Sequence, residues 1–136
     1  MSAEATYAVE KLEKAFRRLR EAANRASDDL ERDGVIQRFE FTFELLWKAI
    51  KILLEYEGFL CAGPRSCIKE GARRGLVVEG ELLLDMLTDR NKTTHIYSEQ
   101  IAEEIFERIK RLYLPVIEQN LRHFARYLGQ EGMVQK

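Results

Sequence analysis

The segment from Arg90 to Tyr97 places an arginine, a histidine and a tyrosine close together. Arg90 and His95 are separated by four residues, and Tyr97 lies two positions beyond the histidine. A guanidinium can hold a phosphate through two parallel hydrogen bonds, and an imidazole near neutral pH can move the proton of an attacking hydroxyl or of a leaving oxygen. The pair therefore favours phosphodiester cleavage. The alternative is that both side chains only satisfy helix-end carbonyls and solvent, because this spacing also arises by accident.

Helical geometry restricts how this segment can form a site. Each helical residue advances about 100° around the axis, so Arg90 and His95 would diverge in an unbroken helix. Asn91, Thr93 and Thr94 favour a break, because short polar side chains compete for backbone hydrogen bonds. One histidine cannot easily serve both the attacking and the leaving oxygen. A twofold dimer would supply two copies of each group in one cleft.

Length and charge limit the classes of protein that can hold this segment. The 136 residues form one domain, 1–136, with enough chain to bury a core. With 22 basic and 23 acidic residues, the chain lacks the positive charge of a general nucleic-acid binder, so any contact with RNA must be local. The amino terminus has no apolar signal segment and no long apolar run follows, which predicts a cytoplasmic protein without a membrane span.

Cysteine and histidine positions argue against a metal centre. Cys61 and Cys67 are the only cysteines, and His95 and His123 lie far from them in sequence. This is neither the spacing of a zinc site nor that of a disulfide framework. We therefore expect two reduced, structural thiols, no metal and no cofactor.

Two long amphipathic helices are predicted in the first half of the chain. Apolar residues at steps of four and three run from Ala5 to Leu30, and aspartates around Asp28 to Asp33 then offer a stop and a new N-cap. The second helix, about Gly34 to Glu57, is apolar on two sides. It fits either a central core helix or one that also forms a subunit interface.

The second half predicts a short helix, a medium helix and a long one. Pro64 begins the short helix, which ends at Gly75, and the medium helix starts after Glu79-Gly80 and leads to Arg90. Ser98 caps the last helix, in which Pro115 should cause a bend and not an end. The predicted fold class is all-α, an antiparallel up-and-down four-helix bundle with an extra short helix, forming a homodimer.

Three stretches carry a resemblance to a known family. They are Arg38-Phe39-Glu40-Phe41-Thr42-Phe43-Glu44-Leu45-Leu46-Trp47-Lys48, then Gly75-Leu76-Val77, then Asp85 to Asn91 followed by His95 and Tyr97. The chain resembles the nucleotidyltransferase substrate-binding protein family of the HEPN group. It is similar to the HepT toxins, whose signature is an Arg, four to six residues, a His, one residue and a Tyr.

The resemblance implies a helical homodimer partnered by a separate minimal nucleotidyltransferase of the MntA type. HepT toxins are metal-independent ribonucleases that this partner silences by adding AMP to the tyrosine. Carried over, Arg90 would bind and polarise the RNA phosphate, His95 would be the acid or base, Tyr97 would accept AMP, and Asn91 would be a supporting polar residue. The older family name implies the alternative, a non-catalytic substrate-binding subunit of a two-component nucleotidyltransferase.

Overall fold

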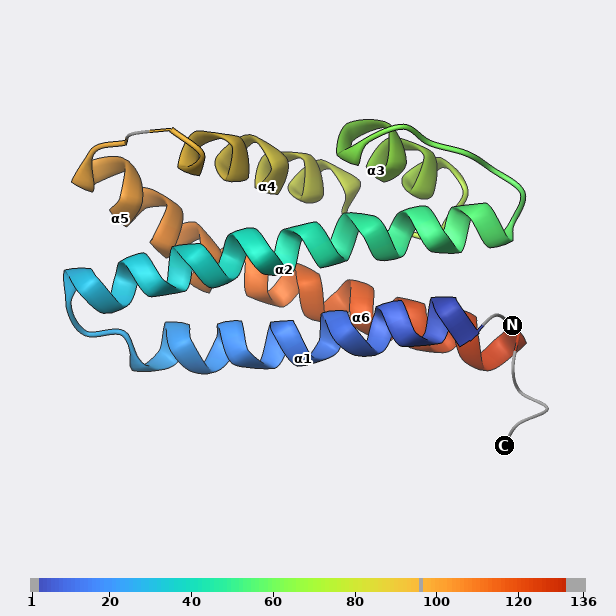
Figure 1. Cartoon of the computed structure of the whole chain (residues 1–136), viewed down its shortest axis with the longest axis horizontal. Helices are drawn as coiled ribbons and strands as arrows, with labels where there is room; N and C mark the ends of the chain where they lie inside the picture. The colour runs from blue at the N-terminus through green and yellow to red at the C-terminus, as the bar shows by residue number, and fades with distance from the viewer. Residues whose placement is uncertain (1–2, 96, 132–136) are drawn as a thin grey trace.

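The computed structural model describes residues 3–95 and 97–131, and within these residues every regular element is a helix (Figure 1). The all-α prediction is confirmed for this part of the chain. The elements, in chain order, are α1 (Ala3–Arg25), α2 (Asp29–Tyr56), α3 (Pro64–Arg73), α4 (Gly80–Thr93), α5 (Glu99–Arg108), the π-helix η1 (Ile109–Tyr113) and α6 (Leu114–Glu131).

The first two helices form an antiparallel hairpin, but the second begins earlier than the sequence predicted. Asp28 is the N-cap of α2, and its side chain accepts a hydrogen bond from the backbone N–H of Glu31 at 2.8 Å. Capping by this aspartate starts the helix five residues before Gly34. Leu30, predicted on the inner face of the first helix, therefore belongs to α2, where it is 81% exposed.

The last helix continues past Pro115, as predicted, with a π-helical turn immediately before the proline. The N–H of Leu114 donates to the carbonyl of Ile109, five residues back, and Pro115 then has no N–H to donate. Figure 1 shows α5 and α6 running in different directions on either side of this turn. The bend allows α5 to reach the end of α4, where the candidate residues lie.

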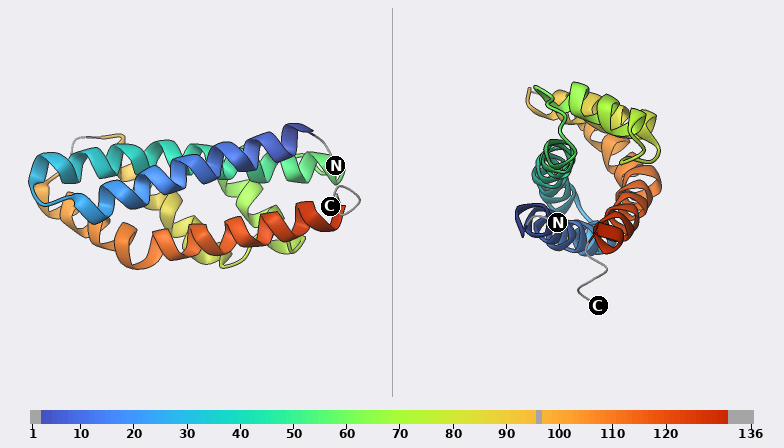
Figure 2. Two further views of the ribbon diagram at one scale, coloured as in Figure 1. Left: turned by 90° about the horizontal axis from the view of Figure 1, so that it is seen from below. Right: turned by 90° about the vertical axis from the view of Figure 1, so that its right-hand side faces the viewer.

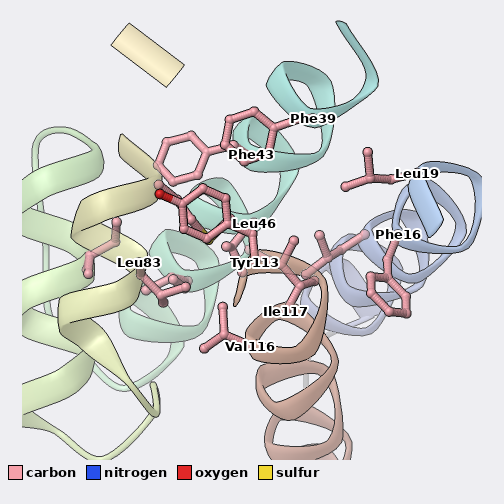
Figure 3. Close-up of a cluster of buried hydrophobic side chains, with 14 of the residues drawn as sticks. Phe16, Leu19, Phe39, Phe43, Leu46, Leu83, Tyr113, Val116 and Ile117 are labelled. Atoms are coloured by element: carbon pink, nitrogen blue, oxygen red, sulfur yellow. The ribbon is translucent and has the colours of Figure 1, made fainter. Parts of the chain in front are cut away.

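Helix α2 is the centre of the core. It contacts α1 on one side and α3, α4 and α5 on others, and the end-on view in Figure 2 shows α3 and α4 closing the top of the molecule. Figure 3 shows Phe39, Phe43 and Leu46 of α2 facing Tyr113 and Ile117. The rings of Phe39 and Tyr113 stack with centroids 5.6 Å apart. Most of the two-sided apolar surface of α2 is thus buried within one chain.

A polar contact fixes the start of α4. The buried side chain of Asn120 on α6 accepts from the N–H of Val78 and donates to its carbonyl, both at 3.0 Å. One ring nitrogen of His123 lies 2.6 Å from the carbonyl oxygen of Gly75 in the preceding turn. These contacts tie the α3–α4 connection to α6, so the direction of α4 is set at its beginning.

The expectation of two free thiols was wrong. Cys61 and Cys67 form a disulfide that closes the connection between α2 and α3. We expected free thiols because the sequence has no larger cysteine framework. A single disulfide needs only that its two cysteines lie close enough together. The chain turns back at Gly63 to begin α3 and brings the two Cα atoms to 5.1 Å, within the range that a disulfide spans.

Candidate functional site

Arg90 lies in the last turn of α4, where its guanidinium forms an ion pair with Glu44 of α2. Its Nη1 also donates to Oδ1 of the adjacent Asn91 at 3.2 Å. The Glu44 carboxylate is shared: it accepts from Nε1 of Trp47 at 3.2 Å and lies 3.9 Å from Nζ of Lys48. Arg90 is therefore held on the face of α2 by a carboxylate that has two other partners.

The helix breaks between Arg90 and His95, as predicted: α4 ends at Thr93 and Thr94 is its C-cap. The hydroxyl of Thr93 donates to the carbonyl of Arg90, and that of Thr94 to the carbonyl of Asn91, both at 2.7 Å. These hydroxyls satisfy two of the carbonyls that a helix end leaves free. The competition expected from the threonines is thus confirmed.

His95 follows this turn, and its imidazole is exposed to solvent. Its backbone N–H donates to the carbonyl of Lys92 at 3.4 Å. Among the described residues, no side-chain hydrogen bond joins His95 to Arg90 or to Tyr97. A single chain therefore brings the two groups to one end of α4 without a direct contact, and Ile96, the next residue, lies outside the described residues.

Tyr97 is half-buried beside the first turns of α2. It lines a pocket of about 420 Å³ with Thr93 and six residues of α2, namely Leu30, Asp33, Gly34, Ile36, Gln37 and Glu40. Burial raises the pKa of the Tyr97 phenol, and the negative charges of Asp33 and Glu40 raise it further, against a smaller opposing effect of Arg32. A phenol is neutral at physiological pH even at its ordinary pKa, so any reaction at the Tyr97 oxygen needs a base to take the proton.

A buried aspartate next to Arg90 organises the site and was not predicted. The Asp89 carboxylate accepts two hydrogen bonds from Arg108, from Nε at 2.7 Å and from Nη2 at 2.9 Å, and a third from the Tyr113 hydroxyl at 2.5 Å. Nζ of Lys92 lies 3.8 Å away. The end of α4 is thus fixed to α5 and to the π-helix by a carboxylate whose side chain is 4% exposed.

The ionisation of this cluster reflects its burial and its pairing. Burial raises the pKa of Tyr113, and the hydrogen bond to Asp89 with its negative charge raises it further. The hydrogen bond to Asp89 also raises the pKa of Arg108. Tyr113 is therefore a neutral donor and Arg108 a permanent cation.

One signal in the sequence could have identified Asp89. It stands three residues after Met86 and seven after Leu82, so it shares the inward-facing stripe of the predicted medium helix. A carboxylate on such a stripe needs a partner, because burying an unpaired charge is costly. No comparable signal marks Glu44, which the periodicity places on the polar strip of its helix.

The described residues contain no group of three or more His, Cys, Asp or Glu side chains that could hold a metal ion. No helix among them is long and apolar enough to span a bilayer. The side chains near the end of α4 include a guanidinium, an exposed imidazole and a phenol, with one amide bonded to the guanidinium. This combination suits proton transfer at a phosphate ester.

Comparison with known proteins identifies the family of the chain. A search of curated protein sequences gave no significant match. A crystal structure of a protein from Thermus thermophilus is 38% identical in sequence with a TM-score of 0.72, covering 86% of this chain and 98% of that one. Residues 7–126 match the family model described as nucleotidyltransferase substrate binding protein like. The chain belongs to this nucleotidyltransferase substrate-binding family.

Proposed function

We propose that this chain is a HepT-like toxin, a metal-independent endoribonuclease that associates with a minimal nucleotidyltransferase of the MntA type and is AMPylated by it. Family membership implies a substrate-binding role beside a nucleotidyltransferase. The observation that supports the finer proposal is the end of α4, where Arg90, exposed His95 and Tyr97 lie within eight residues on a turn fixed by Asp89.

In the proposed reaction, Arg90 holds the scissile phosphate and stabilises the charge that develops on its oxygens. His95 takes the proton of the attacking ribose 2′-hydroxyl, and the bond from phosphorus to the 5′-oxygen breaks. The products are a 2′,3′-cyclic phosphate and a free 5′-hydroxyl. Asn91 supports Arg90 through the hydrogen bond between the two side chains.

The leaving 5′-oxygen needs a proton from a second group. We propose that His95 of a second copy supplies it, in a homodimer of two antiparallel four-helix bundles with α3 as the extra short helix. The exposed position of His95 at a turn supports a composite site at an interface. A monomeric mass in light scattering at micromolar concentration would reject the dimer.

AMP on Tyr97 would add bulk and negative charge two residues from His95, where an RNA phosphate has to approach. Tyr97 lines the pocket of about 420 Å³, which leaves space beside its ring for this adduct. Because a phenol is neutral at physiological pH, the nucleotidyltransferase has to supply the base that activates Tyr97. A toxin incubated with its nucleotidyltransferase and ATP should gain one AMP by mass spectrometry, and Tyr97→Phe should gain none.

The second candidate is a non-catalytic substrate-binding subunit of a two-component nucleotidyltransferase. The ion pair between Arg90 and Glu44 favours it, because an arginine that already has a carboxylate partner is less available to a phosphate. In that case Arg90 and His95 contribute to partner or substrate binding and RNA is not turned over.

Cleavage of labelled RNA in the presence of EDTA separates the two candidates. The wild type should cut RNA, whereas His95→Ala and Arg90→Ala should each lose at least about a hundredfold in rate, the usual contribution of an acid–base group or of a charge-stabilising donor. Arg111→Ala, an exposed cation on the π-helix, should cut at the wild-type rate. If the folded wild type does not cleave RNA, the toxin proposal is rejected and the non-catalytic substrate-binding subunit is favoured.

A further inference from the structure

A groove between α1 and α2 is lined by four basic side chains and by no acidic one. It has a volume of about 380 Å³ and is lined by Lys11, Lys14, Ala15, Arg18, Arg38, Phe41, Thr42 and Leu45. The two helices lie side by side in Figure 1. On each helix the lining residues follow one face, at spacings of three and four, so the groove runs along both helix axes.

The cations of the groove differ from Arg17 and Arg20, two other cations of α1. Among the described residues, Lys14, Arg18 and Arg38 take part in no ion pair, and Lys11 lies over the ring of Tyr7 at 4.8 Å. On the neighbouring faces of α1, Arg17 pairs with Glu13 and Arg20 with Glu118. The chain as a whole has a net charge of −1, so this positive charge is a local feature that a phosphate-bearing ligand could neutralise.

An aromatic side chain stands in the same groove. Phe41 is 61% exposed, although the other phenylalanines of α2, Phe39 and Phe43, are fully buried. Beside it, the hydroxyl of Thr42 donates to the carbonyl of Arg38 at 2.7 Å. An exposed ring between unpaired cations is the combination that binds single-stranded nucleic acids, in which bases stack on rings and phosphates meet Lys and Arg.

We propose that the α1–α2 groove is a binding site for single-stranded RNA, with a base stacked on Phe41 and successive phosphates near Arg38, Arg18 and Lys14. The choice of RNA as ligand rests on the proposed ribonuclease function, whereas the groove itself shares no residue with the Arg90 and His95 site. It gives the protein a means of holding RNA beyond the phosphate to be cleaved.

Other occupants fit the groove less well. A second copy of the chain would bring four cations against four cations across a twofold interface, which is repulsive. A free nucleotide concentrates its phosphates at one end. From Lys11 to Arg18 the cations extend over about 10 Å of helix, which suits a strand with spaced phosphates.

The test is the affinity of the full-length protein for a short fluorescent single-stranded RNA, measured by anisotropy over a range of salt concentrations. His95→Ala serves as the background, so that the RNA stays intact. The double variant Lys14→Ala with Arg18→Ala should bind about tenfold more weakly at moderate salt. Its plot of log affinity against log salt should lose about 1.4 of slope, or about 0.7 for each phosphate contact.

Two further variants separate stacking from charge. Phe41→Ala should lose about tenfold in affinity with an unchanged salt slope, because stacking involves no ion release. The matched control Arg17→Ala with Arg20→Ala removes the same charge from α1 but from paired residues, so its affinity and slope should equal those of the background. Circular dichroism of each variant establishes that it is folded.

The outcomes distinguish this proposal from the proposed function. If the Lys14 and Arg18 double variant has unchanged RNA affinity and an unchanged salt slope, the groove is not an RNA-binding site, even if the wild-type protein cleaves RNA. Binding of ATP with no binding of RNA, or a smaller particle mass for Phe41→Ala in light scattering, would overturn it in favour of a nucleotide or a second copy. Groove-dependent RNA binding by a wild type that never cleaves RNA would support the groove and refute the ribonuclease.

Discussion

Asp89 and Arg90 are adjacent on α4 and have opposite environments. The Asp89 side chain is 4% exposed and has three hydrogen bonds from two residues, whereas the Arg90 side chain is 27% exposed and pairs with Glu44. One helical step separates them by about 100°, so α4 can direct the carboxylate inward and the guanidinium toward solvent. The same turn therefore contains both the anchor of the site and its candidate chemistry.

The difference shows how a site can be both positioned and reactive. A buried carboxylate with several donors is rigid, because each alternative position leaves a charged group unpaired. A partly exposed ion pair is more easily exchanged, because water and competing anions can replace either of its two members at small cost in free energy. Asp89 thus fixes the position of Arg90, and in the proposed ribonuclease Arg90 would have to exchange its weaker partner Glu44 for the phosphate.

The largest expected effect comes from removing the anchor. Asp89→Ala leaves the buried Tyr113 hydroxyl and the Arg108 guanidinium without their acceptor, so the free energy of unfolding should fall by about 3 kcal/mol. Urea unfolding followed by circular dichroism measures the change. Asp85→Ala, on the exposed face of the same helix one turn earlier, should change it by less than about 0.5 kcal/mol. Equal stabilities for the two variants would contradict the role of Asp89 as anchor.

A smaller effect should follow from removing only one donor. Tyr113→Phe deletes the hydroxyl that lies 2.5 Å from Asp89 and should cost about 1 kcal/mol at pH 7, since Arg108 still pairs with the carboxylate. The folded state raises the pKa of Tyr113, so it holds the phenolic proton more tightly than the unfolded chain does. Stability from this group is complete below about pH 10, the unfolded pKa, and is lost as the pH rises above it.

The variant should therefore lose stability less steeply than the wild type above about pH 10, as urea unfolding at a series of alkaline pH values can measure. Tyr7→Phe is the control, because Tyr7 is exposed on α1 and its hydroxyl lies far outside the Asp89 cluster in sequence. Parallel curves for wild type and Tyr113→Phe would show that another group causes the alkaline loss.

Much of the fold followed from local patterns, because helix ends and apolar faces are encoded by neighbouring residues. Pro64, Gly80 and Ser98 each stand where the structure begins a helix, within one residue. The start of α2 was missed because Asp28 and Asp33 are both suitable N-cap residues, and the sequence pattern does not show that Asp28 is the one that caps the helix. The disulfide was missed because a pattern of residues does not reveal how tightly the loop at Gly63 folds back.

The site was predictable in composition but not in its contacts. The residue types of Arg90, His95 and Tyr97 indicated their chemistry, and the threonines indicated a break. The partners of these residues come from other helices: Glu44 is 46 positions from Arg90, and Arg108 is 19 from Asp89. Such pairs depend on how α2, α4 and α5 pack, and one sequence contains no local trace of that packing.

The smallest effect on stability, and the most informative for function, should come from Glu44→Gln. The substitution keeps the shape of the side chain but removes the charge that holds Arg90, and both partners are partly exposed, so the unfolding free energy should change by less than about 1 kcal/mol. A freed guanidinium should bind an RNA phosphate more readily. We expect RNA affinity in the His95→Ala background to rise about threefold, close to about 0.6 kcal/mol.

A double-mutant cycle shows whether this gain acts through Arg90. If it does, Glu44→Gln should have no effect on RNA affinity once Arg90 is alanine, because the two changes address one interaction. Glu55→Gln, which breaks the ion pair with Lys51 at the other end of α2, should leave RNA affinity unchanged in either background. A fall in RNA affinity for Glu44→Gln would mean that the Glu44 carboxylate holds Arg90 in its RNA-binding position. Glu44 would then position Arg90 together with Asp89, and would not be a partner that RNA displaces.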